Sequence, residues 1–221
     1  MVNIQSYISR LTEMLQERFG QRLLYVGLQG SYLRGEANEN SDIDIMVILD
    51  ELTVADLDTY RGLVQSLESY EKSCGFICGE KDLANWNPLE IRNLLGSTKD
   101  YFGQLKDFVP TCTEQDLRNF VKMSLNNLYH EICHRYIHAD RATNAECLPF
   151  TYKGVFFILQ NLHCLRTGKF IGTKAELLAV LTGKDREILI RAMAMKNGEA
   201  FDFADSYALL YAWCQETLQT V

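Results

Sequence analysis

Leu28–Leu49 reads LQGSYLRGEANENSDIDIMVIL, and this stretch predicts the fold of the N-terminal half of the chain. It begins with Gly30-Ser31 after an apolar run and ends with an Asp-Ile-Asp triplet that opens a second apolar run. Side chains alternate between the two faces of a β-strand, so Asp42 and Asp44 are expected on one face, with Cα atoms about 6–7 Å apart. The intervening isoleucine then points to the opposite face, into the core.

Two neighbouring carboxylates at the start of a strand are typical of a site for hard divalent cations. Carboxylate oxygens bind Mg²⁺ together with substrate phosphates, and two ions about 3.5–4 Å apart can contact both the attacking and the leaving oxygen of a phosphoryl transfer. Gly30 would let the backbone approach a phosphate closely, and the Ser31 hydroxyl would donate to its oxygens. The stretch therefore favours a site for a phosphate-bearing substrate and magnesium.

The Gly-Ser pair, the intervening turn and the Asp-x-Asp strand resemble the signature of the DNA polymerase β-type nucleotidyltransferase superfamily. Arg34-Gly35-Glu36-Ala37 fills the turn as in small-molecule members of the kanamycin and lincosamide kind. The resemblance implies an α+β fold, two Mg²⁺ ions held by the catalytic residues Asp42 and Asp44, and ATP or another nucleoside triphosphate as substrate. It also implies that the triphosphate contacts Gly30, Ser31, Arg34 and Ser41.

The remaining pattern predicts a small mixed-sheet nucleotidyltransferase core at residues 1–109 and an α-helical bundle at residues 110–221. Apolar periodicity in the core predicts strands at 23–28, 43–49, 75–78 and 98–105, and helices at 3–19, 53–70 and 88–95. A second Asp-x-Asp, Asp56-Leu57-Asp58, falls on the helix at 53–70, where its carboxylates lie about 200° apart and cannot share a metal. Both aspartates are interpreted as solvated surface residues.

Helical periodicity is nearly continuous from Thr113 onward. It predicts helices from Thr113 through Ile132, from Pro149 to about Arg166, and at 173–181, 184–195 and 203–218. The order of these helices and the Arg-Thr-Gly-Lys-Phe turn resemble the helical C-terminal domain of kanamycin-type nucleotidyltransferases. The resemblance implies an active site between the two domains. Lys153 is the first candidate there for a contact with the triphosphate, because it opens a predicted helix whose apolar face is otherwise uninterrupted, and Lys174 is the second. A surface lysine is the competing interpretation.

The superfamily usually places a third metal carboxylate, which can act as the base, on the strand that follows the helix at 53–70. The strand predicted at 75–78 contains no acid, so Glu80, just beyond it, is the first candidate and Asp82 the second. Some members use a carboxylate from the helical domain, and Glu131 is the candidate there. The competing interpretations are loop acids for the first two and an ion pair with Arg135, one helical turn away, for Glu131.

Composition limits the class of partner. The 221 residues carry a formal net charge of −7 with a pI near 5.2, which argues against a broad nucleic-acid surface and favours a small or cationic acceptor. No apolar stretch approaches the length of a membrane span, and no basic region precedes an apolar signal core, so no membrane partner is expected. Seven cysteines at irregular spacing are typical of reduced thiols, and the expected location is the cytoplasm.

We therefore expect transfer of a nucleoside monophosphate, AMP from ATP, to a hydroxyl of a small molecule such as an aminoglycoside-like antibiotic, with release of pyrophosphate. Kanamycin-type enzymes can share their site across a dimer, so a homodimer is a hypothesis. Two alternatives stay open within the superfamily. One is an antitoxin-type enzyme that modifies a protein or tRNA, and the other is a catalytically inactive sensor that binds nucleotide.

A motif of another class lies at 130–134, where His-Glu-Ile-Cys-His matches the H-E-x-x-H signature of zinc metalloproteases. Relative to the apolar stripe from Leu117 to Ile132, His130 lies about 180° and His134 about 140° away around the helix. The pair therefore faces away from the core of its own helix. A zinc hydrolase is the most remote alternative, and solvated or cleft-lining histidines are the preferred interpretation.

Overall fold

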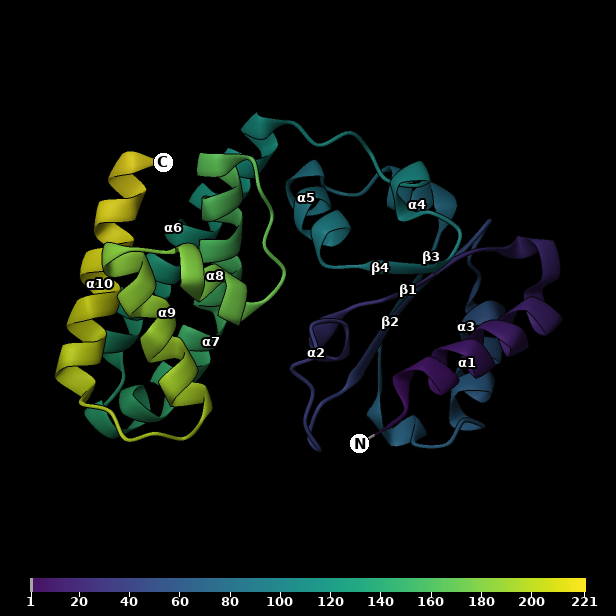
Figure 1. The fold of residues 1–221 in the computed structure, drawn as a ribbon, viewed down its shortest axis with the longest axis horizontal. Coiled ribbons are helices and arrows are strands. Elements are labelled where there is room, and N and C mark those ends of the chain that lie inside the picture. Colours follow the sequence, from purple (N-terminus) through teal and green to yellow (C-terminus); the bar gives the residue numbers. More distant parts are fainter. Residues whose placement is uncertain (1) are drawn as a thin grey trace. The chain divides into compact units, whose positions relative to one another are not determined.

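In the computed structural model, which describes residues 2–221, the chain divides into two compact units after Cys112 (Figure 1). The first unit contains a mixed four-stranded sheet, and the second consists of helices. The α+β class predicted from the sequence is confirmed. The division predicted from the sequence, after residue 109, lies in the segment that precedes the same long helix.

The first unit alternates short strands and helices. Its strands are β1 (Leu23–Leu28), β2 (Ile43–Leu49), β3 (Ser73–Gly79) and β4 (Lys99–Phe102). Its helices are α1 (Ile4–Phe19), α2 (Gly30–Leu33), α3 (Val54–Gln65), α4 (Glu80–Ala84) and α5 (Pro88–Gly96), with 3₁₀ turns at Gly20–Arg22, Tyr70–Lys72 and Leu105–Asp107. The strand order is β3-β2-β1-β4. β1 pairs antiparallel with β2 and β4, whereas β2 and β3 run parallel because α3 connects them.

Alternation along β2 gives the sheet two different faces. Ile43 and Ile45 are buried in the core that the sheet forms with α1 and α3. Met46 and Ile48 are buried in a second, smaller core on the opposite face, together with Leu83 of α4. Figure 1 shows α1 and α3 on one side of the sheet and α4 and α5 on the other. Even-numbered residues of β2 therefore belong to the face that α4 and α5 cover.

The second unit is a helical bundle around one apolar core. The core includes Trp213, Tyr152 and Phe156, each of which is almost completely buried. Among residues 2–221, no helix combines the length and the hydropathy that a membrane span requires. The helices of the unit are α6 (Glu114–His138), α7 (Arg141–Thr167), α8 (Lys174–Val180), α9 (Gly183–Lys196) and α10 (Phe203–Thr220).

The start of α7 corrects the sequence prediction, which placed it at Pro149. The helix begins at Arg141, after Asp140 accepts a hydrogen bond from the Thr143 amide at 3.0 Å as the N-cap. Pro149 therefore lies inside α7, where it removes one backbone donor. Buried residues before and after the proline, such as Leu148 and Tyr152, hold both parts of the helix against the same core. Tertiary packing thus overrides the local helix-start signal.

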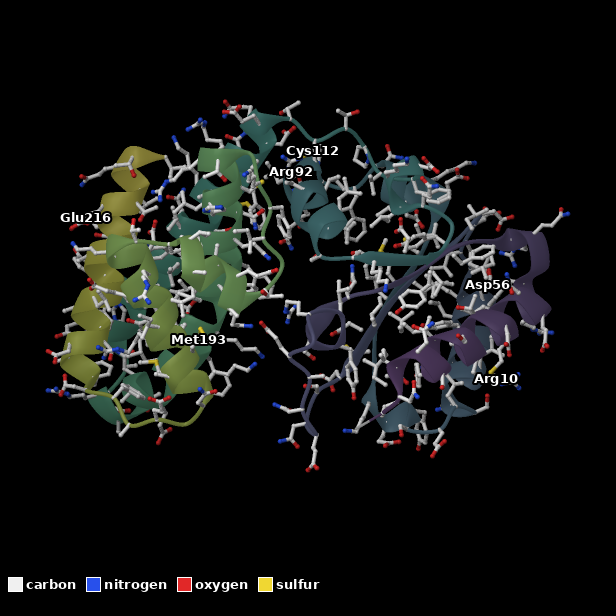
Figure 2. The ribbon with its side chains drawn as sticks, in the orientation of Figure 1. Arg10, Asp56, Arg92, Cys112, Met193 and Glu216 are labelled. Atoms are coloured by element: carbon white, nitrogen blue, oxygen red, sulfur yellow. The ribbon has the colours of Figure 1, made fainter. Side chains whose placement is uncertain are left out.

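Asp56 was predicted to be a solvated surface residue, and that prediction is wrong. Only 7% of its surface is exposed, and Figure 2 labels its position in the first unit. Its carboxylate accepts hydrogen bonds from the Arg22 guanidinium at 2.9 and 3.0 Å and from the Thr53 hydroxyl at 2.8 Å. These bonds hold the pKa of Asp56 well below its usual range. Asp58, in contrast, is exposed as predicted.

Asp56→Asn should lower the melting temperature at neutral pH by several degrees, because the Arg22 guanidinium loses its charged partner. A carboxyl group whose pKa is lowered by folding stabilises the folded state above the unfolded-state pKa, and this contribution disappears as the pH falls through the lower folded value. The gap in melting temperature between wild type and variant should therefore be full at neutral pH and narrow below about pH 4. Calorimetric scans across this pH range measure the gap.

Asp58→Asn is the matched control, since it removes an exposed carboxylate from the same helix. It should leave the melting temperature unchanged. A gap for Asp56→Asn that stays constant from neutral to acidic pH would contradict the role of the ionised carboxylate.

Candidate active site

The Gly-Ser segment and the Asp-x-Asp strand lie side by side where β1 ends and β2 begins. The antiparallel register pairs Leu28 with Ile45, and the Gln29 amide donates to the Asp44 carbonyl oxygen at 2.9 Å. Gly30 then opens α2 directly beside the first residues of β2. The structure therefore brings the two ends of the sequence motif together at one edge of the sheet.

The contact between Gly30 and Asp44 is close enough to dictate the residue type at position 30. Gly30 has a φ of 70°, in the left-handed region. A Cβ atom placed there would lie 1.8 Å from Oδ2 of Asp44 and 2.8 Å from its Cγ. Only glycine gives the backbone this conformation and leaves room for the carboxylate. The glycine thus positions the aspartate as well as leaving its own backbone accessible.

The electrostatics of this edge favour a bound cation. The Asp44 side chain is half-buried, and Asp42 is exposed. Burial raises the pKa of Asp44 above its usual value, and the negative charge of Asp42 raises it further. A hydrogen bond from the Cys74 thiol and the positive charge of Arg34 act in the opposite direction. A cation held by both carboxylates would relieve the repulsion between them.

The donor set fits a hard divalent cation such as Mg²⁺. Carboxylate oxygens are the ligands that Mg²⁺ prefers, and it usually binds through one or two of them together with phosphate oxygens and water. In the described part of the chain, no group of three or more His, Cys, Asp or Glu side chains is arranged to hold a metal. Ligands beyond Asp42 and Asp44 would therefore come from substrate and solvent.

Arg34 lies in the loop that connects α2 to β2. Its guanidinium forms an ion pair with Glu36 at 3.2 Å, and both side chains are largely buried. The Glu36 amide donates to the Ser31 carbonyl oxygen at 2.9 Å, so the loop folds back over the start of α2. Arg34 was one of the residues predicted to contact the triphosphate. Its positive charge acts on Asp44.

Ser41, which was predicted to contact phosphate, takes part in a turn with Asn38. Its hydroxyl accepts a hydrogen bond from the Asn38 amide at 2.9 Å and donates to the Asn38 side-chain oxygen at 3.3 Å. The same Asn38 oxygen accepts from the Asn40 amide at 2.9 Å. These bonds form a turn directly before Asp42. In the structure Ser41 therefore shapes the approach to the strand.

Glu80 was the first candidate for a third carboxylate, and the strand register contradicts it. The parallel pairing sets Asp44 opposite Cys74 at the start of β3, whereas Glu80 follows the end of β3. Six residues of strand separate the two positions, which corresponds to about 20 Å. Asp82 is excluded for the same reason, and its carboxylate caps α4 by accepting from the Gly79 amide at 3.1 Å.

Cys74 occupies the place opposite Asp44 where a third acid was expected. Its side chain is exposed, and its backbone position pairs with that of Asp44 in the parallel register. Cys74 was not a candidate because the strand was predicted to begin at Gly75, two residues after its start at Ser73. A glycine at position 75 was the signal in the sequence that β3 approaches its neighbour closely there. Its φ is 103°, and a Cβ atom at this position would lie 2.0 Å from the Ile45 carbonyl oxygen. A glycine at this position marks the close approach of β2 and β3.

Glu131 and Lys153 belong to the second unit. The Glu131 carboxylate forms an ion pair with Arg135 and accepts a hydrogen bond from the Thr151 hydroxyl at 3.1 Å. The competing interpretation of Glu131, an ion pair one helical turn away, is therefore confirmed. Lys153 is exposed in the middle of α7 and does not open a helix, which removes the reason for choosing it.

The histidines of the H-E-x-x-H motif line one exposed side of α6. The rings of His130 and His134 stack with centroids 5.8 Å apart, and those of His134 and His138 lie 4.6 Å apart. All three side chains are exposed, which the helical-wheel argument predicted for His130 and His134. No cluster with three metal ligands forms around them within residues 2–221. The geometry gives no support to a zinc hydrolase.

Comparison with known proteins identifies the first unit. Residues 8–100, which include β1, β2, β3 and the Gly30–Asp44 edge, match the family model described as a nucleotidyltransferase domain. The match covers 93 of the chain's 221 residues and lies within the first unit, so that unit is similar to a nucleotidyltransferase domain. The family expected from the Gly-Ser and Asp-x-Asp pattern is thereby confirmed.

Two curated relatives align with part of the chain. It is 47% identical over 49 residues to the protein adenylyltransferase MntA of Thermococcus cleftensis, which covers 22% of this chain and 48% of that protein. It is 35% identical over 65 residues to a putative protein adenylyltransferase of Methanocaldococcus jannaschii, which covers 29% of this chain and 63% of that protein. The chain thus spans about half of the first relative and less than two thirds of the second.

A solved structure matches over the whole chain. The spectinomycin adenyltransferase AAD(9) from Enterococcus faecialis, crystallised with ATP and spectinomycin, superimposes with a TM-score of 0.59. The match covers 98% of this chain and 100% of that chain at 14% sequence identity. At this level of identity the similarity shows the fold, a nucleotidyltransferase domain followed by helices.

Gly30→Ala should destabilise the chain more than Gly35→Ala and should also displace Asp44. Both glycines have left-handed φ values, 70° and 66°, so alanine costs about 1–2 kcal/mol of backbone strain at either position. A Cβ at Gly35 has no atom within 4 Å, whereas a Cβ at Gly30 collides with the Asp44 carboxylate. Thermal unfolding of the two variants isolates the effect of the collision.

The second readout is the affinity for Mg²⁺ with ATP, measured by isothermal titration. Gly35→Ala should bind like wild type, and Gly30→Ala should bind on the order of tenfold or more weakly, because its aspartate is displaced. Equal loss of affinity in both variants would refute the positioning role of Gly30.

Proposed function

We propose that this chain is a magnesium-dependent nucleotidyltransferase that moves AMP from ATP to a hydroxyl group of an acceptor and releases pyrophosphate. The observation that supports this most directly is the contact of Gly30 with the Asp44 carboxylate, which unites a phosphate-binding turn with a pair of metal-binding acids. The nucleotidyltransferase family of residues 8–100 and the adenylyltransferase names of the curated relatives support the same reaction.

Asp42 and Asp44 would hold Mg²⁺, which supplies charge neutralisation at the triphosphate when it is bound. The backbone around Gly30 and the Ser31 hydroxyl would donate hydrogen bonds to phosphate oxygens, and Arg34 would add positive charge on the same side. The chain's own contribution is thus to position the triphosphate and to balance its charge, which is the principal source of catalysis in this class of reaction.

The proposed step forms one bond and breaks another. The acceptor oxygen bonds to the α-phosphorus of ATP, the bond from that phosphorus to its bridging oxygen breaks, and pyrophosphate leaves with the electron pair. The hydroxyl proton passes to solvent, since Glu80 lies at the other end of the sheet and Glu131 is paired with Arg135. In the described residues, Cys74 rather than a third acid stands opposite Asp44.

We propose a small, cationic molecule such as an aminoglycoside or aminocyclitol antibiotic as the acceptor. The fold similarity to a spectinomycin adenyltransferase extends over 98% of the chain, including the helical unit. The net charge of −7 favours a cationic acceptor over a nucleic acid. We also propose that the chain forms a homodimer, that it is located in the cytoplasm, and that it binds a second Mg²⁺ ion.

A protein acceptor is the second candidate. It is supported by the two curated relatives, both of which are named protein adenylyltransferases and align with the first unit at 47% and 35% identity. The two candidates share the nucleotide site and differ only in the molecule that supplies the hydroxyl.

Asp42→Asn and Asp44→Asn should each reduce pyrophosphate release from ATP by on the order of 100-fold or more, because each removes a charged ligand of Mg²⁺. Asp58→Asn is the control from the second Asp-x-Asp and should retain full activity. Chelation of divalent cations should abolish release by wild type. Full activity of the Asp44→Asn enzyme would contradict the proposed function.

The acceptor can be identified with ATP labelled at the α-phosphate. Purified chain is incubated with Mg²⁺ and either a panel of aminoglycosides, aminocyclitols and lincosamides or a cell extract depleted of small molecules. Label that moves to a panel compound supports the small-molecule acceptor. Label that appears in a protein band on a denaturing gel, and on no panel compound, would replace it with the second candidate.

A further inference from the structure

A separate cavity of about 600 Å³ opens in the helical unit, where α6 ends and α7 and α10 begin. Its volume lies in the range of small-molecule sites. All of its lining residues belong to the second unit, so it shares none with the Gly30–Asp44 edge. The side chains that characterise it are Tyr136, Arg141, Asn144, Phe203, Tyr207 and Tyr211.

The aromatic walls of the cavity are fixed in place. The rings of Tyr136 and Tyr207 lie 4.6 Å apart between centroids, and those of Phe203 and Tyr207 lie 5.8 Å apart. The Tyr207 hydroxyl donates to the Ile132 carbonyl oxygen at 2.8 Å. Because the Tyr207 ring is held by this hydrogen bond and by two ring contacts, it forms a preorganised surface on which a planar group can stack.

Two polar side chains that line the cavity, Asn144 and Arg141, can bind a ligand. Asn144 lines the cavity and is only 4% exposed as a whole residue. Its side-chain amide offers both a donor and an acceptor, so it can hydrogen-bond a polar edge of a ligand. The guanidinium of Arg141 lies 5.6 Å above the Phe203 ring, and no carboxylate in the described residues forms an ion pair with it. The lining contains no acid.

We propose that this cavity binds a planar aromatic small molecule that carries an anionic group. The ring stacks against Tyr207 and Phe203, the carboxylate, sulfonate or phosphate pairs with Arg141, and Asn144 hydrogen-bonds a polar edge of the ligand. Both nucleotides and aromatic acids have this chemistry. The proposal does not depend on the transferase reaction, because it concerns a different set of residues.

The test uses the full chain and 8-anilinonaphthalene-1-sulfonate, a fluorescent aromatic anion, in buffer without divalent cations. Wild type should bind one equivalent of the probe. Ala208→Trp fills the cavity from its exposed lining on α10 and should weaken binding by about tenfold or more. Arg141→Gln keeps the length of the side chain but removes its charge, and should weaken binding by about three- to tenfold.

Two matched controls separate the cavity from general dye binding. Ala142→Trp adds the same side chain at an exposed position of α7 that does not line the cavity, and Arg186→Gln removes an exposed charge on α9. Both should bind the probe like wild type. Melting temperatures of all variants identify any that are unfolded and would bind dye for that reason.

Competition then identifies the source of the ligand. Displacement of the probe by AMP supports a nucleotide, and displacement by 2-naphthoate but not by AMP supports an aromatic acid. Equal displacement by neutral 2-naphthamide would overturn the requirement for an anion. Unchanged binding in Ala208→Trp would overturn the site itself, as would a doubled mass in light scattering that Ala208→Trp abolishes, since a second copy of the chain would then occupy the cavity.

Discussion

The contact between the Gly30 backbone and the Asp44 carboxylate is the constraint on which the first unit depends. The carboxylate lies where a side chain at position 30 would stand, so the turn after β1 and the first residues of β2 can be built only together. The residues on either side of Asp44 and the turn before β2 hold the carboxylate at this contact. The isoleucines on either side of Asp44 are buried on the opposite face, and the Asn38–Ser41 turn directs the chain into the strand.

Features with a local cause were predictable from the sequence. The alternation of Asp44 with buried isoleucines fixed the faces of β2, and the Thr113 and Asp116 side chains form the capping box that starts α6. One motif was enough to predict the family. The contact between Gly30 and Asp44 requires both a glycine in the turn and an aspartate at the start of the strand. The exposed histidines of α6 also followed from helical periodicity alone.

Features that depend on distant partners were not predictable. The capping box of Thr53 and Asp56 was a local signal for the start of α3. The bonds from Arg22, which lies before β1, to the Asp56 carboxylate could not be predicted from the pattern of α3 alone. The exclusion of Glu80 required the parallel register of β2 and β3, which brings Cys74 opposite Asp44. Pro149 lies inside α7 because the core packs residues on both sides of it. In each case a tertiary contact decided against a reasonable local signal.

The Cys74 thiol sets the charge balance at the edge of the sheet. With a thiol rather than an acid opposite Asp44, the described residues there offer Mg²⁺ two carboxylates, and the guanidinium of Arg34 lies close by. One divalent ion neutralises the pair, and a second would leave surplus positive charge unless the negative charges of a triphosphate came with it. Binding of a second ion at this edge would therefore depend on binding of the triphosphate, whereas the two carboxylates by themselves would balance only one ion.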